Sequence, residues 1–174
     1  MTEKTKNYLN LLKRREYRKL RAEVQALPEC PHDKDSAVMQ TKLFEQALKI
    51  CKPTIYEYDD FGFHQCSNLS LGWGSGNVTP NYKWIITKGF DTVREEIEAS
   101  IISTDDKDKK VYGQLMLRCI DLCVEYSDDF RETVKDKNQK LYNALLKVPH
   151  KPAATCYEAC VFIKLCIYFL RLNY

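Results

Sequence analysis

Cysteine is the residue type in this chain that can take part in the most kinds of chemistry, and eight cysteines occur among 174 residues. Cys119 and Cys123 are four positions apart, as are Cys156 and Cys160, so each pair shares one face of a helix. Thiolates placed in this way could bind zinc or a metal cluster. There is no Cys-x-x-Cys pair, and the histidines lack ligand spacing: they are His32, His64 and His150. We therefore interpret the paired cysteines as small apolar core residues and predict no metal site.

Three other groups of residues are weaker candidates for chemistry. Cys66 and His64 could act as nucleophile and base, but two positions apart in an irregular segment they have no supporting geometry. Gly72–Gly76 fits neither the Rossmann nor the P-loop spacing of a phosphate-binding loop, which favours a connecting loop. The acidic pairs Glu95-Glu96 and Asp105-Asp106 are typical of helix surfaces and caps. We therefore predict no catalytic residue in this chain.

The composition indicates a helical globular protein without a strong charge preference. Glycine and proline occur only six times each, which favours long helices over many turns. The net charge of +3 does not by itself indicate a nucleic-acid or membrane partner. A basic amphipathic helix is nevertheless predicted from about Thr2 to Ala26, before Pro28. It could bind RNA or an anionic surface, but a solvated helix face is the simpler interpretation.

Capping residues and breakers divide the rest of the chain into elements. A helix is predicted to begin near Asp35 or Ser36 and to end before Pro53. Residues 54–79 then alternate aromatic, glycine and small polar residues without a clean period, which predicts an irregular loop. A short strand is predicted near Thr54–Tyr58 within this loop.

Three helices are predicted between Pro80 and Pro149. Pro80 suits the first turn of the first helix, and Gly89 interrupts that helix. Asp105 or Asp106 can cap the second, which reaches Val134 or beyond. A short third helix follows over Asn138–Leu146. The predicted core face of the second helix consists of Val111, Leu115, Cys119, Leu122 and Tyr126.

The last predicted helix is apolar on nearly every side. Thr155-Cys156-Tyr157-Glu158 forms a capping box, and the helix that it opens is apolar nearly all round from Ala159 to Leu172, interrupted only by Lys164 and Arg171. A helix without a polar face must be buried on all sides or span a membrane, and this one is too short to span. Each large apolar side chain left in water loses roughly 1.5–3 kcal/mol of the stabilisation that burial would give. We therefore expect either that the preceding helices enclose this helix or that a covering surface is supplied by further sequence or by a partner chain.

Two stretches of this sequence resemble motifs of the pyruvate formate-lyase-like glycyl radical enzymes. Gly74–Tyr82 followed by Ile85–Phe90 resembles an early motif of that family, in which Gly-His, two residues and Pro-Asp-Tyr precede a helix that ends in Gly and an apolar residue. Val148–Ala159 is similar to the family's Val-Pro, Pro-Ala, Thr-Phe-Tyr-Glu-Ala stretch, which opens the helix that leads into the catalytic barrel. The order and separation of the two stretches indicate the N-terminal helical part of the family's domain.

The resemblance implies a radical mechanism. In this family a separate radical S-adenosylmethionine activase installs a glycyl radical, which forms a thiyl radical on a barrel cysteine, and the enzymes are homodimers. Neither the Arg-Val-x-Gly-Tyr pattern of the radical loop nor the cysteine loop is found in this sequence. The resemblance therefore implies no cofactor in this chain, and it assigns no catalytic role to the chain's cysteines.

The sequence departs from the family pattern at two positions. Asn77 occupies the place where many members have His, and Asn81 the place where many have Asp. The resemblance implies that Asn77 is a substrate-pocket residue, which could hydrogen-bond a hydroxyl but could not transfer a proton near neutral pH. A turn residue in a glycine-rich loop is the alternative for Asn77.

These observations predict a mainly α chain whose residues 1–174 form a partial domain, the helical N-terminal layer outside an α/β barrel that lies beyond this sequence. The predicted function is that of the front part of a radical lyase or dehydratase acting on a small organic substrate, inactive alone. Its expected partners are the barrel portion or a chain that carries it. The alternative is a stand-alone helical module that binds a protein through the last helix or RNA through the first. The charged first residues lack a signal peptide's apolar segment, which predicts a cytoplasmic protein with reduced cysteines.

Overall fold

The computed structural model describes residues 36–51, 60–63 and 80–172, and over these residues every regular element is an α-helix. The mainly α prediction is therefore confirmed for the described part, which contains no strand. The predicted basic helix, the strand near Thr54–Tyr58 and most of the loop over 54–79 lie outside the described residues. The helices are α3 (Ala37–Ile50), α4 (Tyr82–Ser103), α5 (Lys107–Val134), α6 (Gln139–Leu145) and α7 (Cys156–Leu172).

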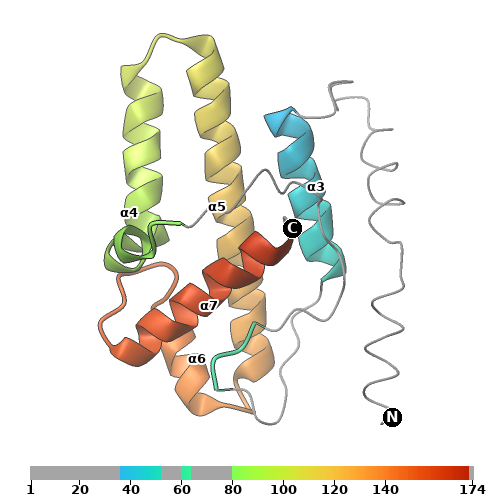
Figure 1. The fold of residues 1–174 in the computed structure, drawn as a ribbon, viewed down its shortest axis with the longest axis vertical. Helices are drawn as coiled ribbons and strands as arrows, with labels where there is room; N and C mark the ends of the chain where they lie inside the picture. The colour runs from blue at the N-terminus through green and yellow to red at the C-terminus, as the bar shows by residue number, and fades with distance from the viewer. Residues whose placement is uncertain (1–35, 52–59, 64–79, 173–174) are drawn as a thin grey trace.

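Two long antiparallel helices, α4 and α5, form the hairpin on which the other helices are arranged (Figure 1). The carboxylate of Asp106 accepts hydrogen bonds from the backbone N–H groups of Asp108 and Lys109, so α5 begins where the sequence predicts. At the start of α4 the prediction needs correction. Pro80 precedes the helix, and Asn81 is its N-cap, because the Asn81 side chain accepts from the N–H of Trp84 at 3.1 Å.

Single side chains also set the boundaries of the shorter helices. The hydroxyl of Ser36 accepts from the N–H of Met39 at 3.1 Å and caps α3, as predicted. The side chain of Asn138 accepts from the N–H of Leu141 at 3.0 Å and starts α6. In each case the cap satisfies a backbone donor that has no partner within the helix. Local sequence therefore determines these boundaries.

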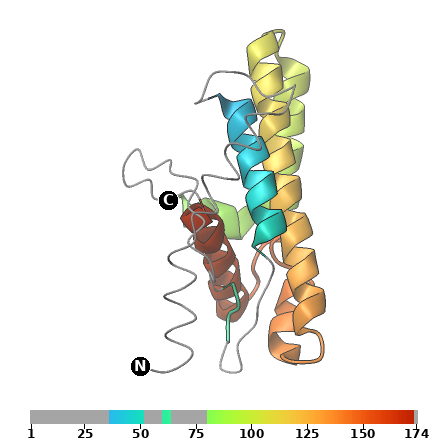
Figure 2. The same ribbon diagram turned by 90° about the vertical axis from the view of Figure 1, so that its right-hand side faces the viewer.

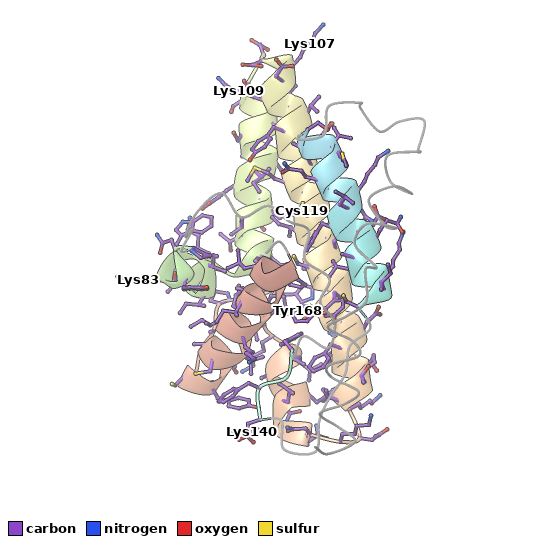
Figure 3. All side chains as sticks on the ribbon, turned by 45° about the vertical axis from the view of Figure 1, so that its right-hand side comes forward. Lys83, Lys107, Lys109, Cys119, Lys140 and Tyr168 are labelled. Atoms are coloured by element: carbon purple, nitrogen blue, oxygen red, sulfur yellow. The ribbon has the colours of Figure 1, made fainter. Side chains whose placement is uncertain are left out.

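The hydrophobic core lies where α7 crosses the lower half of α5, beside α3 and α6 (Figures 1 and 2). Phe44 of α3 meets Phe169 of α7 edge to face, with ring centroids 5.8 Å apart. The rings of Tyr126 and Tyr168 stack, and their hydroxyl oxygens are 2.6 Å apart, so two buried polar groups satisfy each other. The opposite end of the hairpin, marked by Lys107 and Lys109, extends away from this core (Figure 3).

Because the far end of the hairpin extends beyond the core, the predicted core face of α5 is wrong in part. Leu122 and Tyr126 are buried, but Val111 is 49% exposed because it lies in the part of the helix beyond the core. Helical periodicity identifies the face of a helix correctly, but it does not determine how far along the helix the neighbouring elements reach.

The preceding elements enclose α7 to a large extent. Phe162 and Phe169 are buried, while Ile163, Ile167 and Leu170 are half-buried, so no large apolar side chain described in α7 is left fully in water. Of the two expectations for this helix, the described residues therefore favour enclosure by the chain's own elements. No helix in the described ranges is long and apolar enough to cross a bilayer.

Candidate functional site

A backbone junction joins a break in α4 to the segment that leads into α7. We call residues 147–153 the strap. Gly89 has non-helical φ and ψ angles and divides α4 into two helical arms. The N–H groups of Phe90 and Asp91, which begin the second arm, donate to the carbonyls of Pro149 and His150 at 2.8 and 3.1 Å. The strap thus accepts hydrogen bonds from donors that a helix start leaves unpaired.

The first arm of α4 is held by the same segment. The carbonyl of Ile86 accepts a hydrogen bond from the N–H of Ala153 at 2.9 Å. Within the strap, the N–H of Lys151 donates to the carbonyl of Lys147 at 2.8 Å and closes a turn, and the Val148–Pro149 peptide bond is cis. Both arms of α4 are therefore paired with one short segment, which fixes where α7 begins.

The junction requires glycine at position 89. Gly89 has φ 76° and ψ 163°, a combination that essentially only glycine adopts. A Cβ added there would lie 2.4 Å from the carbonyl oxygen of His150 and 2.6 Å from the carbonyl carbon of Lys151. These are backbone atoms, which cannot move aside as a flexible side chain would. The missing side chain therefore allows the close approach of the strap to α4.

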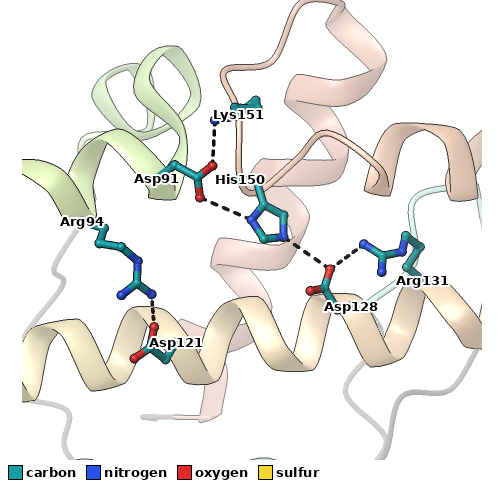
Figure 4. Close-up of polar contacts among 7 residues, drawn as sticks. All are labelled: Asp91, Arg94, Asp121, Asp128, Arg131, His150 and Lys151. Carbon is teal, nitrogen blue, oxygen red and sulfur yellow. Dashed lines mark hydrogen bonds and ion pairs between the residues drawn. The ribbon is translucent and has the colours of Figure 1, made fainter.

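A charged network covers the junction (Figure 4). The Nδ1 atom of His150 lies 3.3 Å from Asp91 on α4, and its Nε2 atom lies 3.4 Å from Asp128 on α5. Lys151 pairs with the other oxygen of Asp91 at 2.9 Å, and Arg131 pairs with Asp128 at 2.6 Å. One imidazole ring therefore connects the strap to both helices of the hairpin.

This network is suited to holding elements together rather than to acid–base chemistry. Burial raises the pKa of the Asp91 carboxyl, but hydrogen bonds from Lys151 and His150, and their positive charge, outweigh this effect, so the pKa lies below its ordinary value. A general base needs a free nitrogen or oxygen directed at its substrate. Here a carboxylate occupies each nitrogen of the ring, and neither nitrogen is left to face a substrate.

Glu158 secures the other end of the segment. Its carboxylate accepts hydrogen bonds from the N–H groups of Ala154 and Thr155 at 2.7 and 3.2 Å and from the ammonium of Lys147 at 3.0 Å. In return the Thr155 hydroxyl accepts from the N–H of Glu158 at 3.1 Å, which confirms the predicted capping box. Burial raises the pKa of Glu158, but the hydrogen bonds from Ala154, Lys147 and Thr155 and the charge of Lys147 lower it, and the net pKa lies below its ordinary value.

The cysteines chosen from their spacing do not form one common site. The core interpretation is wrong for Cys156 and Cys160, which are exposed because they lie on the outer side of the first turns of α7. Cys119 and Cys123 are half-buried between helices, and burial raises the pKa of both thiols. The Cys119 sulfur is 3.8 Å from the hydroxyl of Thr41. The described residues contain no group of three or more His, Cys, Asp or Glu side chains that could hold a metal ion.

The remaining candidates lie outside the part of the chain that the structure describes. These are the substrate-pocket candidate Asn77, the pair His64 and Cys66, and the glycine-rich stretch at 72–76. Conversely, local pattern analysis missed the network partners Asp91 and Asp128. They are 59 and 22 positions from His150, so no spacing within one element could have revealed them.

Comparison with known proteins identifies one family. Residues 48–172 match the family model described as pyruvate formate lyase-like. The matched range includes the Gly89 break, the strap and all of α7. No curated protein and no solved structure matches the chain.

Proposed function

The chain belongs to the pyruvate formate lyase-like family, and on that premise we propose that it forms the helical layer packed outside the α/β barrel of a glycyl radical lyase or dehydratase acting on a small organic substrate. The observation that supports this proposal is the junction at Gly89. It joins the end of the first motif, Ile85–Phe90, to the start of the second, Val148–Ala159, through two backbone hydrogen bonds, and the next residue, Asp91, adds a third. Motifs that are distant in sequence but paired in space are expected where a family preserves an architectural contact.

In this proposal the junction positions α7. In the family that the sequence resembles, the second motif opens the helix that leads into the barrel. In this chain the strap and Glu158 determine where that helix starts, and Phe162 anchors it against Phe90 at a centroid distance of 5.2 Å. The helical layer would thus fix the position at which the chain enters the barrel.

The radical chemistry is assigned to the barrel and not to the described helices. In this family a glycyl radical supplies the thiyl radical that abstracts hydrogen from the substrate. The described cysteines do not fit that role. Cys166 is buried in the helical core, and the exposed Cys156 and Cys160 lie on the outside of a helix. We infer that a barrel, an activase and a second copy of the enzyme are its partners, in a reducing cytoplasm that keeps these thiols free.

Asn77 remains the proposed substrate contact of this chain. Its carboxamide can both donate to and accept from a substrate hydroxyl, but it cannot transfer a proton. In the assembled enzyme, Asn77→Ala is expected to raise KM more than it lowers kcat, whereas a proton-transfer residue would show its main effect on kcat. Unchanged kinetics in Asn77→Ala would leave Asn77 as a turn residue only.

The proposal is tested by assembly of the enzyme. The 174-residue chain would be produced together with a barrel-bearing polypeptide of this family from the same genome, activated anaerobically by a radical S-adenosylmethionine activase, and examined by electron paramagnetic resonance. We expect the glycyl radical signal and substrate turnover only when both parts are present. A barrel that is activated equally well without this chain would contradict the proposal.

The alternative function, a protein- or RNA-binding module, receives less support from the described residues. The large apolar side chains of α7 are already buried or half-buried, so this helix offers little free apolar surface to a partner. The basic segment over about 2–26 is the remaining feature in its favour. Salt-sensitive retention of the chain on immobilised RNA, lost when that segment is removed, would support the alternative.

A further inference from the structure

The ring of His150 lies between two carboxylates that belong to different helices. Its Nδ1 atom faces Asp91 of α4 at 3.3 Å and its Nε2 atom faces Asp128 of α5 at 3.4 Å. An ionised carboxylate has no proton to donate, so each of these contacts needs an N–H from the ring. A neutral imidazole carries one N–H and the imidazolium carries two. Only the protonated ring can therefore donate to both helices at once.

The surrounding charges keep both carboxylates in place as acceptors. Lys151 of the strap pairs with Asp91 at 2.9 Å, and Glu95 of α4 is near enough to act on the charge of Lys151. Arg131 of α5 pairs with Asp128 at 2.6 Å. These cations would stay with the carboxylates when the ring loses a proton. The carboxylate facing the deprotonated nitrogen would then meet a lone pair instead of a donor.

We propose that His150 is a proton-operated clasp: with both ring nitrogens protonated it ties the strap to α4 through Asp91 and to α5 through Asp128, and release of one ring proton opens one of these two contacts. The clasp lies directly over the backbone hydrogen bonds at Gly89. The carbonyl of His150 itself accepts from the N–H of Asp91, and the adjacent Pro149 accepts from Phe90. Opening the clasp therefore loosens the hold of the strap on α4 and with it the start of α7.

Amide hydrogen exchange on the whole 174-residue chain measures this hold directly. The N–H groups of Phe90 and Asp91 donate to the strap, so their protection reports how often the junction opens. Exchange would be followed from about pH 5 to about pH 8, the range in which unperturbed histidine side chains change charge. At each pH the wild-type chain is compared with variants under the same conditions, so that the intrinsic pH dependence of exchange cancels.

Asp128→Asn is the decisive variant. Its carboxamide can accept from a ring N–H or donate to a ring lone pair, so the contact survives in both states of the ring. Asp129→Asn, at the exposed neighbouring position, makes the same change in charge without touching the ring. We expect protection of Phe90 and Asp91 to fall about tenfold from acid to alkaline pH in the wild type and in Asp129→Asn, the value of one charge-assisted hydrogen bond, but to stay nearly constant in Asp128→Asn.

His150→Gln provides an independent check, because glutamine does not change its charge in this range. In this variant, the exchange protection of the Phe90 and Asp91 N–H groups is expected to be lower than in the wild type at acid pH and independent of pH. A wild-type profile that is flat, or one that Asp128→Asn reproduces in full, would overturn the clasp. Because these measurements involve neither a barrel nor an activase, their outcome is separate from that of the proposed function.

Discussion

Gly89 shows how one missing side chain allows two distant segments to meet. Gly89→Ala would place a non-glycine residue in a backbone region that costs on the order of 1–3 kcal/mol, and its Cβ would also collide with backbone atoms of His150 and Lys151. We predict a loss of unfolding free energy larger than this backbone cost alone, measured by urea denaturation.

Gly113→Ala is the matched control for this prediction. A Cβ at Gly113 would lie 2.6 Å from Cγ1 of Ile101, a side-chain atom and not a backbone atom, and Gly113 lies within regular helix, where alanine gains about 0.5–1 kcal/mol. Gly113→Ala should therefore lower the free energy of unfolding much less than Gly89→Ala does. Equal losses in the two variants would contradict the role assigned to the Gly89 break.

Glu158 links the stability of the junction to pH. Because its folded pKa lies below the ordinary value of 4.5, ionised Glu158 stabilises the folded chain above about that pH, and this contribution is lost as pH falls through the folded pKa. Glu158→Gln is expected to lose about 1–3 kcal/mol at neutral pH, because its amide cannot replace all the hydrogen bonds to the carboxylate.

The pH profile distinguishes this effect from a simple packing defect. The difference in unfolding free energy between wild type and Glu158→Gln should shrink as pH falls below about 4.5, since the wild-type carboxyl then also loses its charge. Glu98→Gln, at a half-exposed position on α4, should show little loss at either pH. A constant difference at all pH values would count against the ionised cap.

At the scale of elements, substitutions in α7 test which side of this apolar helix faces the core. Phe162 is completely buried and meets Phe90 edge to face, whereas the adjacent Ile163 is half-buried. Phe162→Ala is expected to cost about 3–5 kcal/mol, the usual range for a buried phenylalanine, and Ile163→Ala clearly less. Thermal and urea unfolding of the two variants would check this order, and a reversed order would mean that α7 is rotated about its axis.

At the scale of the whole molecule, the cysteines report which surfaces are covered. Cys156 and Cys160 are exposed, whereas Cys51 and Cys166 are buried. Short treatment of the native chain with iodoacetamide, followed by peptide mass spectrometry, should label the first two quickly and the last two only after unfolding. Rapid native labelling of Cys166 would show that α7 is not held against the core.

The sequence by itself determined the features that depend on neighbours within one turn of helix. Ser36, Asp106, Asn138 and the Thr155–Glu158 capping box mark helix starts through hydrogen bonds that span two or three positions, and the structure contains each of them. Residues 74–90 and 148–159 also indicated the family, which the match over residues 48–172 shows. The helix starts can be predicted from the sequence because the hydrogen bonds that set them are local.

Only the tertiary structure decided how these elements meet. The contacts of His150 with Asp91 and Asp128 and the pairing of Gly89 with the strap join residues from α4, α5 and the segment before α7, so no periodicity encodes them. The exposure of Cys156, like the enclosure of α7, depends on which elements cover a given side of a helix. Burial is a property of the packed arrangement, since a single apolar stretch can be covered by several different neighbours.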